Sequence, residues 1–103
     1  MKISIIFNLF FICLSMLESY GQDKEATYYT VSGKVMENDG SLLPGVSIYI
    51  KNEPGVGVIT TVNGEFTIKV PKNEQLVFSF VGYKKYEYLV TKNISGLKVV
   101  LEE

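Results

Sequence analysis

The side chains that could support catalysis are few. The sequence contains neither histidine nor arginine, and its only cysteine, Cys13, lies inside an apolar N-terminal run. A serine or cysteine nucleophile needs a base to take its proton, usually histidine. A catalytic zinc ion is ordinarily held by histidine, cysteine and carboxylates. We therefore expect no catalytic residues, no cofactor and no metal site, and we do not expect an enzyme.

Carboxylates are the groups that remain for acid–base chemistry. Asp39, Glu53, Glu65 and Glu74 all lie in or beside turn sequences. Solvated loop acids are the ordinary outcome at such positions, so paired general acids and bases are not indicated. A calcium site at Asn38 and Asp39 would need six or more oxygen ligands, and the local acids are too few.

Tyrosine is the residue type with the most scope for binding. The chain has seven tyrosines and no tryptophan. An outward tyrosine on a strand can form a protein interface or stack on a sugar ring. Tyr49 and Tyr86 are the two candidate interface residues. The alternative for each is packing against a neighbouring strand of a half-exposed sheet.

The first 21 residues have the layout of a signal peptide. A single basic residue precedes an apolar run at residues 3–17, which then gives way to polar and small residues. The run is shorter than the roughly 20 apolar residues of a membrane-spanning helix. We expect cleavage after Gly21, with an uncleaved N-terminal anchor as the alternative. Lipid anchoring at Cys13 is disfavoured because apolar residues follow it.

One small domain follows the export signal. Residues 22–27 are polar and lack an apolar period, which predicts a tether, and residues 28–103 form the domain. All ten basic residues are lysines, and they nearly cancel eleven acidic residues. A nucleic-acid footprint requires a clustered basic face, so neither DNA nor RNA is an expected partner.

The domain sequence alternates apolar and polar residues in short runs separated by turn signals. This period-two pattern, without a helical period, predicts about seven strands in an all-β, antiparallel or mixed β-sandwich, with an open barrel as the alternative. Asn63-Gly64 is suited to a type I′ hairpin turn. The run 76–81 predicts a central strand covered on both faces. The expected strands are 29–36, 46–51, 56–62, 65–70, 76–81, 85–90 and 97–102.

The ordered turns resemble a known family. Val31-Ser-Gly-Lys-Val35, Leu43-Pro-Gly-Val46, Asn63-Gly-Glu-Phe66 and Leu76-Val-Phe-Ser-Phe-Val-Gly-Tyr83 resemble the carboxypeptidase regulatory-like domain. The version most similar is the one at the N-terminus of SusC/RagA-type TonB-linked outer-membrane proteins of Bacteroidetes. The resemblance implies a transthyretin-like (prealbumin-like) sandwich. Its structural motif maps to Gly33, Gly40, Pro44, Gly45, Asn63, Gly64, Phe66, Gly82 and Tyr83.

The resemblance also implies a function and a cellular location. Such domains are accessory modules rather than catalysts, and in the transporters they face the periplasm. We expect an exported, non-catalytic interaction module in the periplasm or at the periplasmic face of the outer membrane. Its expected partners are envelope proteins, including components of a TonB-dependent uptake system. The chain is either free-standing or the truncated head of a transporter.

Two other functional hypotheses and one departure from the family pattern remain. The alternative function is a carbohydrate-binding β-sandwich that uses exposed tyrosines. A degenerate hydrolase is disfavoured because its chemistry would need the absent histidine and arginine. Thr61 stands where the family often has an aspartate, two residues before the Asn-Gly turn, which bears on any acid-dependent function of that turn.

Overall fold

A computed structural model describes residues 27–103, which hold seven strands and no helix. The predicted signal peptide and residues 22–26 of the predicted tether lie outside the described residues. Thr27, the last tether residue, accepts a backbone hydrogen bond from Lys72 at 2.8 Å. The strands are β1 (Tyr28–Glu37), β2 (Ser47–Ile50), β3 (Glu53–Ile59), β4 (Glu65–Pro71), β5 (Gln75–Ser79), β6 (Tyr86–Leu89) and β7 (Ile94–Leu101).

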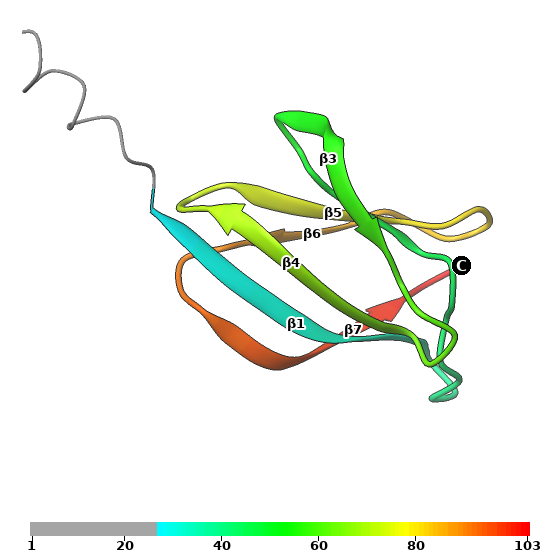
Figure 1. Ribbon diagram of the computed structural model, residues 1–103. Coiled ribbons are helices and arrows are strands. Elements are labelled where there is room, and N and C mark those ends of the chain that lie inside the picture. The colour runs from blue at the N-terminus through cyan, green and yellow to red at the C-terminus, as the bar shows by residue number, and fades with distance from the viewer. Residues whose placement is uncertain (1–26) are drawn as a thin grey trace, which may run out of the picture.

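The strands form two sheets that pack face to face (Figure 1). One sheet has the order β4-β1-β7 and the other has the order β3-β2-β5-β6. β7 pairs in parallel with β1, whereas the other paired strands are antiparallel. The predicted mixed, seven-stranded β-sandwich is confirmed, and the two separate sheets differ from an open barrel.

The core lies between the sheets and follows the period-two pattern of the sequence. Val31 and Val35 of β1 are fully buried, and β4 alternates strictly between exposed and buried residues. The Phe78 ring, also fully buried, packs edge-on against Phe66 with 5.4 Å between the ring centroids. β5 lies between β2 and β6, and its Val77 is buried on the outer face, so the predicted central strand is confirmed, although it ends at Ser79 rather than at residue 81.

Two local expectations were wrong. β3 begins at Glu53, three residues before the expected start, because Pro54 is accommodated at the edge of the sheet. The Asn63-Gly64 turn does not close a hairpin, since β3 and β4 belong to different sheets. A type I′ turn also needs positive φ at both central residues, and here Gly64 has a φ of 71° while Asn63 is not in that region.

The strand order places three connections at each end of the sandwich. The β1–β2, β3–β4 and β5–β6 connections share one end with the last residues of β7, on the right of Figure 1. The β2–β3, β4–β5 and β6–β7 connections share the other end with the start of β1. The molecule therefore presents two separate groups of loops.

Candidate functional site

Most of the predicted motif gathers at one end of the sandwich. We define the loop end as residues 38–46, 60–64 and 80–85, the connections that share an end with the finish of β7. Seven of the nine motif residues lie in these loops. Gly33 and Phe66 lie instead in β1 and β4, where they are register partners. A Cβ at Gly33 would overlap the Leu97 carbonyl of β7, which explains the glycine.

Val35 joins two of the three loops. Its amide donates a hydrogen bond to the Gly64 carbonyl at 2.8 Å, and its carbonyl accepts one from the Leu43 amide at 2.9 Å. Gly64 has positive φ, and a Cβ there would lie 2.7 Å from the Val35 carbonyl oxygen. This close approach requires glycine, so the β3–β4 turn is held firmly against β1.

The buried Thr60 side chain holds the β1–β2 loop in place through hydrogen bonds. Its side chain is buried, and its hydroxyl donates to the Leu43 carbonyl at 2.7 Å and accepts from the Val46 amide at 2.9 Å. The Thr60 carbonyl also accepts a bond from the Gly45 amide at 3.1 Å. The sequence analysis missed this residue, because a threonine at the end of a strand carries no signal of a long-range partner.

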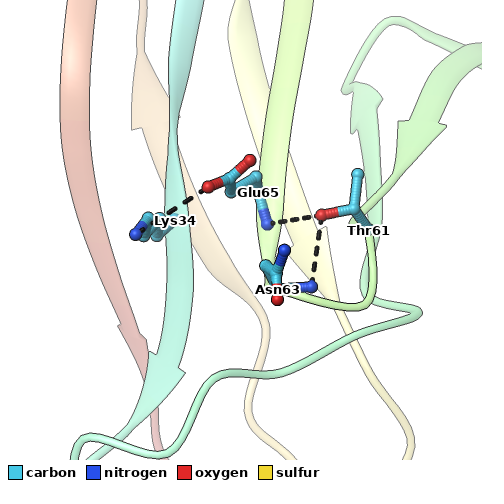
Figure 2. A network of polar contacts seen from close by, with 4 residues as sticks. All are labelled: Lys34, Thr61, Asn63 and Glu65. Carbon is cyan, nitrogen blue, oxygen red and sulfur yellow. Dashed lines mark hydrogen bonds and ion pairs between the residues drawn. The ribbon is translucent and has the colours of Figure 1, made fainter.

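Thr61 organises the β3–β4 turn (Figure 2). Its hydroxyl oxygen accepts hydrogen bonds from the amides of Asn63 at 3.3 Å and Glu65 at 3.2 Å. Glu65 also forms an exposed ion pair with Lys34 at 3.8 Å. An aspartate at position 61 could accept the same bonds, so the hydroxyl can replace it as the turn acceptor.

The β5–β6 loop is hydrogen-bonded to the chain at the C-terminal end of β7. The Tyr83 ring stacks on Phe80 with centroids 5.7 Å apart, and the Tyr83 amide donates to the Phe80 carbonyl at 3.1 Å. The next amide, that of Lys84, donates to the Glu102 carbonyl at 2.7 Å. The third loop is thereby fixed beside the last residues of the described chain.

Acidic residues line a shallow groove at this end. The groove has a volume of about 460 Å³ and is lined by Glu37, Asn38, Asp39, Tyr83, Leu101, Glu102 and Glu103. Asp39 accepts a hydrogen bond from the Ser41 amide at 2.9 Å, and the bonds from Ser41 lower the pKa of its carboxyl group below the ordinary 3.8. Asp39 is consequently ionised at neutral pH.

Apolar side chains are exposed at the same end. Val81 and Val62, in two of its loops, are 94% and 85% exposed, and Ile59, at the end of β3, is 67% exposed. These are the three most exposed large apolar residues among residues 27–103. Leu42 in the remaining loop is 40% exposed. Each of the three loops therefore carries an apolar residue into solvent.

The opposite end is polar. Its three connections each contain a Lys-Asn pair, and we call it the Lys-Asn end. Val90 is the apolar residue of these connections and is fully buried, although Tyr28 at the start of β1 and Leu89 at the end of β6 are 58% and 49% exposed. The pairs are Lys51-Asn52, Lys72-Asn73 and Lys92-Asn93.

The two candidate interface tyrosines do not form one surface. Tyr49 pairs with Val77 and Tyr86 pairs with Phe78, the next residue of β5, so the tyrosines face opposite sides of the same sheet. Tyr49 is half-buried on the outer face. The Tyr86 ring packs edge-on against Phe78 with centroids 5.8 Å apart, at the margin of the core.

Two other features are absent from residues 27–103. No three histidine, cysteine, aspartate or glutamate side chains gather there as metal ligands. In the same part of the chain, no helix has the length and apolar character needed to cross a bilayer.

Comparison with known families assigns residues 31–103 to the model described as CarboxypepD_reg-like domain. The chain belongs to the CarboxypepD_reg-like domain family. The match spans β1 from Val31 to the end of β7, so it includes all three loops of the loop end. The family resemblance expected from the sequence is confirmed.

Two curated relatives come from Formosa agariphila. TonB-dependent receptor P26 is 38% identical over 72 residues, which are 70% of this chain and 7% of the receptor. TonB-dependent receptor P39 is 30% identical over 81 residues, which are 78% of this chain and 8% of the receptor. The CarboxypepD_reg-like domain thus spans less than a tenth of the length of either relative.

Proposed function

We propose that this CarboxypepD_reg-like domain is a non-catalytic interaction module of a TonB-dependent uptake system in the bacterial envelope. The observation that supports the proposal most is the similarity to two TonB-dependent receptors across 70% or more of the chain. The loop end adds a physical reason, because three rigidly held loops expose apolar side chains rather than titratable groups poised for chemistry. A surface of this kind is suited to contact with another protein.

The export expectations belong to the same proposal. Residues 1–21 act as a signal peptide, residues 22–27 as a tether, and residues 28–103 as a domain in the periplasm or at the periplasmic face of the outer membrane. An N-terminal apolar run and the absence of cysteine from residues 14–103 support this arrangement. N-terminal sequencing of the protein from its own cells tests it, and a chain that retains Met1 would contradict cleavage.

The carbohydrate-binding alternative loses its main support. Its two candidate tyrosines face opposite sides of one sheet, and Tyr86 packs on a core phenylalanine. They cannot stack together on one sugar. No other feature of the described residues favours this alternative over a protein interface.

The experiment is cross-linking of the full chain in the envelope of the cells that produce it, followed by mass spectrometry of the linked proteins. An unrelated exported β-sandwich of similar size serves as the control. We expect TonB-dependent receptors to be enriched over that control. A cytosolic chain, or an envelope chain linked to no such receptor, would contradict the proposed function.

A further inference from the structure

We propose that the loop end is the surface with which this domain docks on the body of a TonB-dependent receptor, meaning the receptor outside the segment that matches this chain. The inference rests on the proposed function and assigns it a surface. Its occupant is a protein surface with an apolar centre and cationic groups at its margin.

The most exposed apolar side chains of the described residues lie at the loop end. Val62, Val81 and Ile59 come from separate parts of the sequence, and the topology brings all three to one end. Each leaves most of its surface in water, so folding of the domain itself does not explain them. Exposed apolar side chains that lie at the same end of a domain mark a candidate surface for association.

The loops of the loop end are already ordered in the domain alone. Val35 bonds to two of them, Thr60 bonds to Leu43 and Val46 from inside, and Lys84 bonds to the finish of β7. A surface held in this way loses little conformational freedom when it binds, which favours affinity. These internal bonds leave the side chains of Val62 and Val81 free to contact a partner.

The net charge of the loop end favours a cationic partner. Four acidic residues line the groove of this end, and Lys84 and Lys85 in the third loop leave an excess of two negative charges. An anionic lipid surface would be repelled by that excess. A cationic side chain of a protein could enter the groove beside the Tyr83 ring, where carboxylates and an aromatic face both favour a cation.

The two relatives favour the receptor body as the occupant of the loop end. In P26 and P39 the segment that resembles this domain is joined covalently to a receptor more than ten times its length. β7 ends at the loop end, so any polypeptide that continues from this domain leaves beside these loops. Where the receptor body follows the domain, attachment there raises its effective concentration at the loop end rather than at the Lys-Asn end.

The test uses a P26 variant that lacks the matching segment and is held in nanodiscs. It measures how tightly the full chain binds to this variant. Val62→Asp and Val81→Asp alter the loop end, and Val56→Asp is the matched control because Val56 is an exposed valine of edge strand β3, before Ile59. We expect each loop-end variant to weaken binding by about tenfold or more, as for a residue at the centre of an interface. We expect V56D to bind like the unaltered chain. Thermal unfolding of each variant confirms that it is folded.

The outcomes separate this inference from the proposed function. Binding that is unchanged in V62D and V81D overturns the docking surface but leaves the receptor partnership standing. Failure of the unaltered chain to bind overturns docking on the receptor body, whereas cross-linking in the producing cells decides the proposed function. Intact P26 should bind more weakly, because its own segment occupies the site. Loop-end-dependent binding to vesicles containing phosphatidylglycerol, without binding to the receptor, would identify a lipid surface and overturn the proposal.

Discussion

The two ends of the sandwich are built from the same strands but use different chemistry. At the Lys-Asn end, the turns depend on asparagine: Asn52 donates to Glu74 at 2.9 Å, Asn73 has a φ of 64°, and Asn93 accepts from the Thr30 amide at 2.8 Å. Backbone bonds, such as that from the Asn73 amide to the Val90 carbonyl, also hold this end. At the loop end, backbone bonds and the side chains of Thr60, Thr61 and Asp39 hold the loops. Polar side chains at the first end are used for folding and solvation. Internal bonding at the second end leaves apolar side chains available for a partner.

The largest expected effect comes from the core that both ends share. Phe78→Ala should destabilise the domain by about 3–5 kcal/mol, because a fully buried ring that contacts Phe66 and Tyr86 is lost. A domain of this size has little stability to spare, so the unfolding midpoint should fall sharply. Urea denaturation followed by circular dichroism measures the change. A midpoint equal to that of the unaltered chain would show that β5 is not the centre of the core.

The next largest effect on stability compares two glycines, one with close backbone neighbours and one without. Gly64→Ala should cost about 2–3 kcal/mol, since positive φ is unfavourable for alanine and its Cβ would crowd the Val35 carbonyl. Gly82→Ala has positive φ but no neighbour within 4 Å of the new Cβ, so it should cost only about 1–2 kcal/mol. Equal losses of unfolding free energy in the two variants would mean that the β3–β4 turn is not pressed against β1.

A third pair of variants compares one hydrogen-bonded side chain from each end. Thr60→Val keeps the shape of a buried side chain but removes the partner of Val46 and Leu43, so it should cost about 1–3 kcal/mol. Asn93→Ala removes an exposed bond to Thr30, where water can replace it, and should cost less than about 1 kcal/mol. The measurement is the free energy of unfolding of each variant. A larger loss for N93A would reverse the comparison between the ends.

The smallest effect is a pH dependence confined to the loop end. Because the pKa of Asp39 in the folded domain is below its ordinary 3.8, its contribution to stability is present above pH 3.8 and is lost as the pH falls through the folded pKa. The Ser41 amide, which donates to Asp39, should report this titration in NMR spectra. Asp39→Asn should abolish that titration. A Ser41 amide that titrates above pH 3.8 would contradict the lowered pKa.

The sequence predicted the strands well and their partners poorly. Alternation of apolar residues identified the buried positions of β4 and β7, and the continuous apolar run identified β5. Pro54 suggested a break, although an edge strand tolerates a residue without an amide donor. The placement of β3 and β4 in different sheets depends on long-range pairing, which local turn residues do not encode.

For the same reason, only part of the candidate site could be predicted from the sequence. The sequence identified Gly64, Gly82 and Tyr83 as turn residues but could not place their loops at a common end, because that follows from the strand order. Val62 and Val81 resemble ordinary strand residues until the structure shows them exposed in loops. Thr60 could not be found from the sequence, since its partners lie 14 and 17 residues away.

Amide hydrogen exchange of the full chain, alone and with the receptor body of P26, tests the difference between the two ends most directly. The account predicts slower exchange on binding in residues 38–46, 60–64 and 80–85, because the partner covers the loop end. It predicts no change in residues 51–52, 72–74 and 90–93. Protection of the Lys-Asn end with an unchanged loop end would contradict the account.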